Sequence, residues 1–148
     1  MLELLNEPSF IRNIADRGVR TLEQAREYIA DKFIASYEEH GFGMYLVELK
    51  ATGGAVGICG LVKRDTLQDI DIGYAFLPAY WSKGYATESV LAVKEYAKNT
   101  IGLNRVAGIV APDNQGSIRV LEKAGLMYEK MVKLSEDDIE LKLYATEL

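Results

Sequence analysis

The chain has 148 residues, of which 49% are hydrophobic and 26% are charged, and its formal net charge is −5. This length predicts one domain, residues 1–148, with a core that needs neither a disulfide nor a metal. A single cysteine excludes a disulfide framework and favours a reducing, cytoplasmic location. The sequence has no long apolar run and no basic cluster, which argues against a membrane span and against nucleic acid as a partner.

The first part of the chain predicts helices. Residues 2–14 are expected to form short helical pieces around Pro8. The next helix begins at a capping box, since Thr21 is followed three residues later by Gln24, and it ends at Gly41. Apolar residues at helical spacing predict its buried stripe: Leu22, Ala25, Ile29 and Phe33.

The period then changes to that of strands, which are predicted over residues 43–49, 55–64 and 70–77. The glycines of GGAVGICG (53–60) are interpreted as hairpin and bulge residues. In the third strand Ile70, Ile72, Tyr74 and Phe76 face one way, and Asp71, Gly73, Ala75 and Leu77 face the other. Two small residues on one face indicate that a helix or a ligand packs closely there.

The second half of the chain alternates helices with strands. A helix is predicted over 87–102, a strand over 105–112 and a helix over 113–125, with Asp113 or Asn114 as its N-cap. The last two strands are predicted at 126–134 and 139–148, joined by the polar turn SEDD. The order of elements predicts an α+β domain around a mostly antiparallel sheet.

The stretch WSKGYATE places small residues where the predicted helix begins. The first N–H groups of a helix lack internal partners and carry the positive end of the helix dipole. Gly84 and Ala86 leave these groups sterically open. Ser82, Lys83 and Thr87 add two hydroxyls and one positive charge. Such a cradle is typical of pyrophosphate binding, although neither the dinucleotide fingerprint nor a P-loop pattern is present.

WSKGYATE resembles the acetyl-CoA-binding loop of the GNAT superfamily of N-acetyltransferases, whose pattern is Gln/Arg-x-x-Gly-x-Gly/Ala. Gly84 and Ala86 match this pattern, and Trp81 replaces the usual Gln or Arg. With IDIGYAFLPAY before it and NQGSIRVLEKAGL after it, the chain is similar to the branch that contains ribosomal-protein alanine N-acetyltransferases. The resemblance covers nearly the whole chain. It implies a mixed sheet of about six strands flanked by helices, with a V-shaped opening, made by a bulge, between residues 70–77 and 105–111.

The resemblance implies acetyl-CoA as cosubstrate, an amine as acceptor and no metal. Phe76 and Leu77 would pair by their backbone with the pantetheine arm, and Asn114 and Ser117 would contact the cofactor from the last helix. The CoA pyrophosphate would bind backbone amides of the loop: Ser82, Lys83, Gly84, Tyr85, Ala86 and Thr87.

Acetyl transfer to an amine needs a base, an oxyanion donor and a proton for the leaving thiolate. Asp71 is the first candidate for the base because it shares a strand face with two small residues, and Asp69 is the second. A backbone N–H of the bulged strand is the expected oxyanion donor. Many superfamily members use a tyrosine acid at the position of Leu121, so Ser117 is the expected substitute, directly or through water.

Other reactive side chains are expected to be structural. His40 lies at a helix C-terminus, where it is expected to cap the helix, and Cys59 is expected to be a small core residue. No Cys/His/Asp spacing indicates a metal site.

The resembling family begins with a strand and a longer first helix, and this chain is expected to start within that helix. An exposed sheet edge, an incomplete acceptor pocket and lower stability are the expected results, and a short natural form or a homodimer that covers the edge is compatible with them.

The leading hypothesis is an N-acetyltransferase that acts on a protein N-terminus or a small amine. The alternatives are a non-catalytic acyl-CoA-binding or sensing module and an interaction domain without a ligand.

Overall fold

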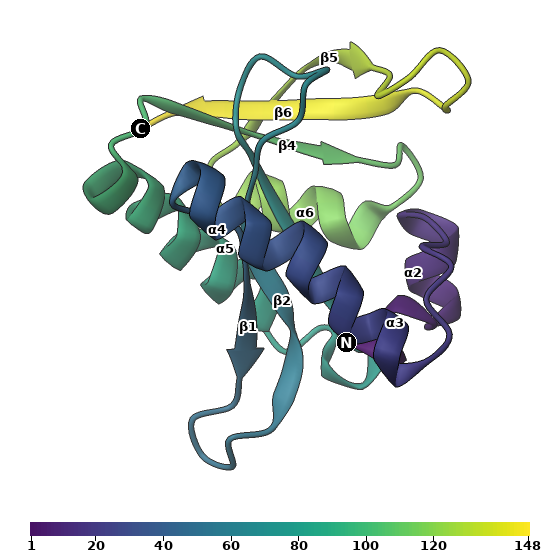
Figure 1. The fold of residues 1–148 in the computed structure, drawn as a ribbon. Coiled ribbons are helices and arrows are strands. Elements are labelled where there is room, and N and C mark those ends of the chain that lie inside the picture. Colours follow the sequence, from purple (N-terminus) through teal and green to yellow (C-terminus); the bar gives the residue numbers. More distant parts are fainter.

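The computed structural model describes residues 1–148 and contains the predicted order of elements, shown in Figure 1. The helices are α1 (Leu2–Leu5), α2 (Pro8–Asn13), α3 (Leu22–Tyr28), α4 (Ala35–His40), α5 (Tyr85–Tyr96) and α6 (Gln115–Lys123). The strands are β1 (Met44–Glu48), β2 (Ala55–Val62), β3 (Asp71–Phe76), β4 (Arg105–Val110), β5 (Met127–Val132) and β6 (Leu141–Glu147). π-helical turns, η1 (Ile29–Ile34) and η3 (Ala97–Ile101), join α3 to α4 and extend α5, and η2 (Pro78–Tyr80) is a short 3₁₀ helix.

The six strands form one mixed sheet in the order β1-β2-β3-β4-β6-β5. All neighbours are antiparallel except β3 and β4, which are parallel. This arrangement confirms the predicted fold class, including the number of strands. No helix is both long enough and apolar enough to cross a membrane.

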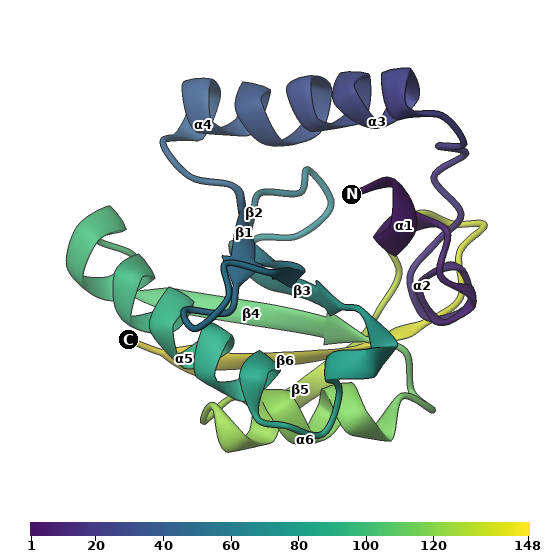
Figure 2. The same ribbon diagram turned by 90° about the horizontal axis from the view of Figure 1, so that it is seen from below.

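Helices cover both faces of the sheet, as Figure 2 shows, with α5 and α6 on one face and the N-terminal helices on the other. The face toward α5 and α6 carries the larger core, in which Leu61, Val90 and Val106 are fully buried. The opposite face packs against a smaller group, the N-terminal cluster, which consists of Leu4, Leu5, Phe10, Val19, Ala25 and Ile58. The alternation predicted for β3 is confirmed, because Ile72 and Tyr74 pack on the first face and Ala75 on the second.

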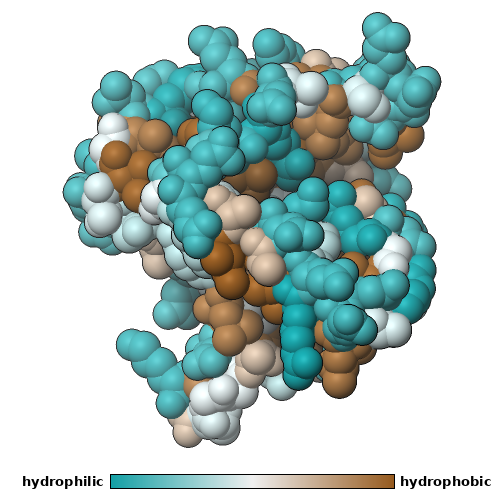
Figure 3. Space-filling model, in the orientation of Figure 1, coloured by the Kyte–Doolittle hydropathy of each residue, from teal (hydrophilic) through white to brown (hydrophobic).

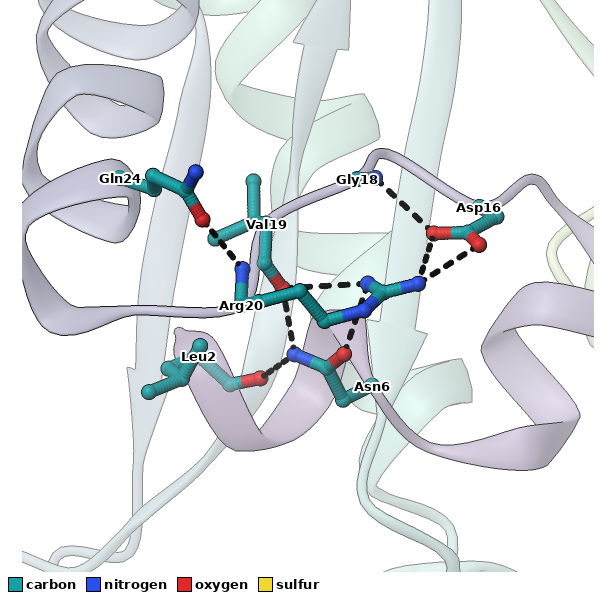
Figure 4. A network of polar contacts seen from close by, with 7 residues as sticks. All are labelled: Leu2, Asn6, Asp16, Gly18, Val19, Arg20 and Gln24. Carbon is teal, nitrogen blue, oxygen red and sulfur yellow. Dashed lines mark hydrogen bonds and ion pairs between the residues drawn. The ribbon is translucent and has the colours of Figure 1, made fainter.

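A polar network holds the N-terminal helices in place (Figure 4). The side-chain amide of Asn6, after α1, donates to the carbonyl oxygens of Leu2 and Val19 at 2.8 Å each. Arg20 donates to Asn6 Oδ1 at 2.9 Å and to both carboxylate oxygens of Asp16 at 2.9 and 2.7 Å. The segment between α2 and α3 is thereby tied to α1.

The predicted helix boundaries are confirmed where a cap specifies them. Thr21 and Gln24 form the capping box of α3, and Gly41 ends α4 with a φ of 77°. Gly125, with a φ of 90°, follows α6 in the same manner. The predicted stripe is wrong at its first residue, because Leu22 is 67% exposed and does not belong to the N-terminal cluster.

Two further predictions needed correction. The last two strands are joined by residues 133–140 rather than by SEDD alone, since β6 begins at Leu141 and Ile139 is exposed. Gly57 is not a hairpin residue. It lies inside β2, where a Cβ would come within 2.6 Å of a ring carbon of Phe76, so close packing excludes a side chain.

Strand β1 is the first strand of the sheet, so its outer edge has no neighbouring strand. Its Leu46 is exposed. Figure 3 shows polar surface over most of this face, with apolar patches near its middle, where β1 and β2 lie in Figure 1.

Candidate active site

The two edges of β3 are paired to very different extents. Toward β2 the register is continuous from Gly57↔Phe76 to Val62↔Asp71. Toward β4 it consists of one pair, Asp71↔Ala107, with Ala107 N donating to the carbonyl of Ile70 at 2.9 Å. The strands therefore meet at Asp71 and diverge beyond it, which is the predicted V-shaped opening.

The predicted bulge in this region is wrong. The register between β2 and β3 has no shift, and the shifts of the sheet lie between Val47 and Glu48 and between Tyr128 and Lys130. The opening instead results from the divergence of β4, which remains fully paired with β6.

The backbone of β3 presents polar groups to this opening. Leu77 N donates to Val56 O at 3.0 Å, so the odd-numbered residues of β3 direct their N–H and C=O groups toward β2. By alternation the groups of Tyr74 and Phe76 point toward β4, where the two strands have separated. A ligand with amide groups can pair with them as an added strand would.

The loop that follows β3 leads into the N-terminus of α5 at the mouth of the V. Gly84 is the N-cap of α5, with a φ of 84°, and no side chain caps the helix. A Cβ on Gly84 would meet no atom within 4 Å, so the space above these N–H groups is open. Ser82 is the one residue other than glycine with a positive φ, 60°, and it is exposed together with Lys83. This geometry suits an anion held by backbone N–H groups.

Trp81 connects the loop to the strand. Its indole Nε1 donates to the carbonyl oxygen of Phe76 at 2.8 Å, while the residue as a whole is 47% exposed. The carbonyl of Leu77 accepts from Tyr80 N at 2.9 Å. The carbonyls of both residues whose backbone was predicted to pair with a pantetheine arm thus have partners, and each retains one lone pair because a carbonyl oxygen accepts two hydrogen bonds.

The start of α6 lies across the opening from β3. Asn114 is the N-cap of α6 and accepts from Ser117 N at 3.2 Å, which confirms the predicted cap. The Tyr74 hydroxyl reaches over from β3 and lies 3.0 Å from Ser117 O and 2.6 Å from Ser117 Oγ. Burial raises the pKa of Tyr74 to about 12.

Asp71 lies at the vertex of the V and is 1% exposed. Arg64 Nε donates to its Oδ1 at 3.1 Å. Burial raises the pKa of Asp71 to about 6, although the guanidinium of Arg64 opposes this shift. The carboxyl group thus titrates near neutrality, in the range that suits a general base. A Cβ on Gly73 would lie 3.2 Å from Met44 Sδ and 3.3 Å from Val62 Cγ2, so a larger residue would require these side chains to shift.

A second polar cluster lies beside the vertex, on the side away from the opening. Arg105, at the start of β4, donates to Asp69 at 3.0 Å and to Glu147 at 3.0 Å, and it also pairs with Glu129. One guanidinium therefore links the segment before β3 to β4, β5 and β6. Asp69, the second candidate for the base, is committed to this cluster.

The remaining candidates have structural surroundings. Leu121 is 1% exposed and fills the core beside Gly108, where a Cβ would lie 2.7 Å from it. Cys59 is buried as predicted, and burial raises the pKa of its thiol to about 12. His40 stacks on Phe42 with ring centroids 5.6 Å apart, and the residue that ends the helix is Gly41 rather than His40. No group of three or more His, Cys, Asp or Glu side chains is placed to hold a metal ion.

The structure brings together two groups of predicted site residues. Phe76 is joined to the loop through Trp81, and Asn114 is joined to Ser117. The two predicted catalytic residues lie on opposite faces: Asp71 belongs to the face of the N-terminal helices, and Ser117 lies by α6.

Sequence reasoning missed Tyr74 and Arg64, whose partners lie 43 and 7 residues away. The face assignment of β3, which directs Tyr74 toward α6, is the signal that was available for Tyr74.

Comparisons with known proteins give the family. Residues 1–127 match the model described as acetyltransferase (GNAT) domain. The Bacillus subtilis (strain 168) protein YkkB is 31% identical over 88% of this chain and 75% of its own length. The probable N-acetyltransferase YjcK of the same organism is 35% identical over 76% of this chain. The chain spans 63% of the length of YjcK.

Solved structures agree on the fold. A GNAT-family acetyltransferase from Bacillus anthracis has a TM-score of 0.80 at 25% identity, covering 99% of this chain and 86% of that one. The Vibrio cholerae spermidine N-acetyltransferase, in complex with CoA and spermine, has a TM-score of 0.78 at 14% identity, covering 98% and 86%. The ribosomal L7/L12 α-N-protein acetyltransferase RimL, in complex with coenzyme A, has a TM-score of 0.75 at 19% identity, covering 90% and 76%. This chain belongs to the GNAT acetyltransferase family.

Proposed function

We propose that residues 1–148 form one acyl-CoA N-acyltransferase domain that transfers an acetyl group from acetyl-CoA to a primary amine by direct attack on the thioester. The observation that carries this proposal is the opening between β3 and β4. These strands are paired only at Asp71↔Ala107, and the uncapped N-terminus of α5 lies at the mouth. A ligand that has a diphosphate at one end and an amide-containing arm matches both parts.

The diphosphate binds the loop and the first turn of α5. The backbone N–H groups from Ser82 to Thr87 hold its oxygens, Gly84 leaves them accessible and Lys83 adds a charge. Because these donors are fixed dipoles, an anionic cofactor can bind to a chain with a net charge of −5.

The pantetheine arm enters the V and pairs with the backbone of β3 at Phe76, whereas the expected pairing at Leu77 is not retained because its N–H is bonded to Val56 O on the β2 side. The free lone pair of the Phe76 carbonyl and the N–H groups directed toward β4 supply its partners. The N–H of Tyr74 or Phe76 takes the place of the expected bulge as the donor to the thioester oxyanion. Asn114 and Ser117 contact the cofactor from α6.

The acceptor amine approaches from the face of the N-terminal helices, where Asp71 removes its proton directly or through water. The amine nitrogen then forms a bond to the acetyl carbon, the C–S bond breaks, and the thiolate receives a proton from the side of Ser117. The opposite placement of Asp71 and Ser117 supports this division, because the thioester would lie between them.

The relatives suggest which amines to test first. One structural neighbour is a spermidine acetyltransferase and another acetylates a protein α-amine. The test is calorimetry with acetyl-CoA, followed by thiol release on a panel of polyamines, short peptides with free N-termini and the same peptides with blocked N-termini. Tight binding and release of CoA with one free amine class support the proposal, and the absence of acetyl-CoA binding contradicts it.

A non-catalytic acyl-CoA-binding module is the second candidate. One observation favours it: Leu121, at the position where many superfamily members have a tyrosine acid, is packed in the core. Acetyl-CoA binding without thiol release on any amine of the panel would support this second function.

A further inference from the structure

The hydrogen bonds between Tyr74 and Ser117 have a place in the fold that no other side-chain hydrogen bond shares. They join β3 to α6, the two elements that lie on either side of the open part of the V. Tyr74 lies three residues beyond the vertex at Asp71, about 10 Å along the strand at ~3.3 Å per residue. An arm threaded between β3 and β4 passes this pair.

The protons of the pair can be counted. The carbonyl oxygen of Ser117 only accepts, and Tyr74 has one hydroxyl proton. If Tyr74 donates to Ser117 O at 3.0 Å, then the 2.6 Å contact is made by the Ser117 hydroxyl, which donates to Tyr74. If the Ser117 proton goes elsewhere, Tyr74 can turn its own proton to Ser117 Oγ at the same distance. The pair therefore has two hydrogen-bond arrangements that differ by one rotation of each hydroxyl.

The second arrangement is the one that a proton donor needs. A serine hydroxyl alone is a weak acid, and its conjugate alkoxide is costly in a partly buried site. With Tyr74 donating to Ser117 Oγ, negative charge on that oxygen is stabilised by a charge-assisted hydrogen bond.

We propose that Tyr74 is a positioning residue that makes Ser117 a competent donor to the leaving thiolate, so that a phenol on β3 acts through a serine on α6. This inference rests on the proposed acetyl transfer. As the C–S bond breaks, the Ser117 Oγ–H bond breaks and an S–H bond forms. The Tyr74 proton moves to Ser117 Oγ, and when CoA leaves, the proton that the base took from the amine returns through water to the phenolate. The amine gives its proton to the base, so the numbers of protons and electrons balance.

The test is a double-mutant cycle of Tyr74→Phe and Ser117→Ala, measured with the best amine of the panel. Each single change is expected to lower kcat about 100-fold, at the lower end of the range for a lost proton donor, and to leave the KM for acetyl-CoA within about threefold. The double variant is expected to be no slower than the slower single variant, because residues that act as one unit are not additive. If the two single decreases in kcat instead multiply in the double variant, the proposed relay, in which Tyr74 acts through Ser117, is contradicted.

Two further variants separate the relay from a structural role. Tyr144→Phe is the matched control, because Tyr144 is also buried and its hydroxyl forms no hydrogen bond to the protein, so its kcat should be unchanged. Ser117→Thr retains a hydroxyl and is expected to keep kcat within about fivefold of the original chain. If Tyr74→Phe does not fold, equal kcat for Ser117→Ala and Ser117→Thr overturns the proposal.

The outcomes for the relay and for the proposed function are distinct. An original chain that releases no thiol with any amine contradicts acetyl transfer itself. An active original chain whose Tyr74→Phe variant keeps its kcat, or loses only affinity for acetyl-CoA, contradicts the relay alone.

Discussion

The two edges of strand β3 use the same backbone for different purposes. Its edge toward β2 is paired along the whole strand, and the side chains beside it, such as Leu61, belong to the buried core. Its edge toward β4 is paired at one position, and the polar groups beyond that position face an opening. We therefore expect the edge toward β2 to determine stability and the edge toward β4 to determine binding, so that changes at each edge affect separate measurements.

The largest expected effect is on stability, at the closed edge. Leu61→Ala removes a fully buried side chain between β2 and α5 and should lower the free energy of unfolding by about 3 kcal/mol, within the ~2–5 kcal/mol typical of core truncations. Urea unfolding measures this change. Leu46→Ala, at an exposed position of β1, is the control and should cost less than about 0.5 kcal/mol. A large loss of acetyl-CoA affinity in folded Leu61→Ala would contradict this separation of stability from binding.

The next effect is on binding, at the mouth of the open edge. Gly84→Val places a β-branched residue at a φ of 84° above the α5 N–H groups. Acetyl-CoA affinity should fall about 30-fold or more, since the strain is at least ~1–2 kcal/mol and the new side chain covers the donors. Gly53→Val, at a φ of 71° with equally free space around it, is the matched control. Scanning calorimetry should show a similar decrease in the melting temperature of both variants. Titration calorimetry should show weakened acetyl-CoA binding in Gly84→Val alone.

A third effect concerns pH, at the vertex where the two edges meet. With Asp71 as the base, kcat/KM should rise as the pH increases through about 6, because the carboxylate form is active. Asp71→Asn should lower kcat/KM about 10-fold or more and remove this limb, whereas Asp69→Asn should retain it. A pH profile that is identical in Asp71→Asn and the original chain would exclude Asp71 from the mechanism.

The same shift affects stability with the opposite sign. The folded chain holds the Asp71 proton more tightly than the unfolded chain does, because the pKa is raised from 3.8 to about 6. This contribution is fully present below pH 3.8, decreases as the pH rises to about 6, and is absent above it. Its size is about 3 kcal/mol, at ~1.36 kcal/mol per pKa unit. The pH dependence of urea unfolding should show this slope, and Asp71→Asn should lack it.

The smallest effect is expected at the link between loop and strand. Trp81→Phe removes the hydrogen bond to the Phe76 carbonyl, so the loop is held less firmly and acetyl-CoA should bind about three- to tenfold more weakly, as for one lost hydrogen bond of ~0.5–1.5 kcal/mol. Because Trp81 is the only tryptophan, its fluorescence should also change when the original chain is titrated with acetyl-CoA. Unchanged affinity in Trp81→Phe would show that the indole does not support the loop.

Local signals in the sequence predicted much of the fold. The capping box at Thr21, the glycines that end helices and the period-two alternation of β3 depend on neighbouring residues, and these features were confirmed. The π-helical turns and the exposure of Leu22 depend on how the long helix lies on the sheet, and local periodicity does not contain that information.

The candidate site likewise combines features that depend on neighbouring residues with contacts between residues far apart in the sequence. The open N-terminus of α5 follows from a short stretch around Gly84, so the sequence could indicate it. The contacts of Ser117 with Tyr74 and of Arg105 with Asp69 join residues 43 and 36 positions apart. The sheet order brings these residues together, and a single sequence offers no pattern for such a meeting.

The Arg105 cluster gives the open edge a pivot. Arg105 lies two residues before the Asp71↔Ala107 pair and fastens the converging ends of four segments, while the other end of β3 lies about 17 Å away at ~3.3 Å per residue. A rotation of roughly 5° at the pivot would move the mouth by about 1.5 Å over this span. Salt, which weakens exposed ion pairs, should therefore alter how widely the mouth opens without touching a residue that lines it.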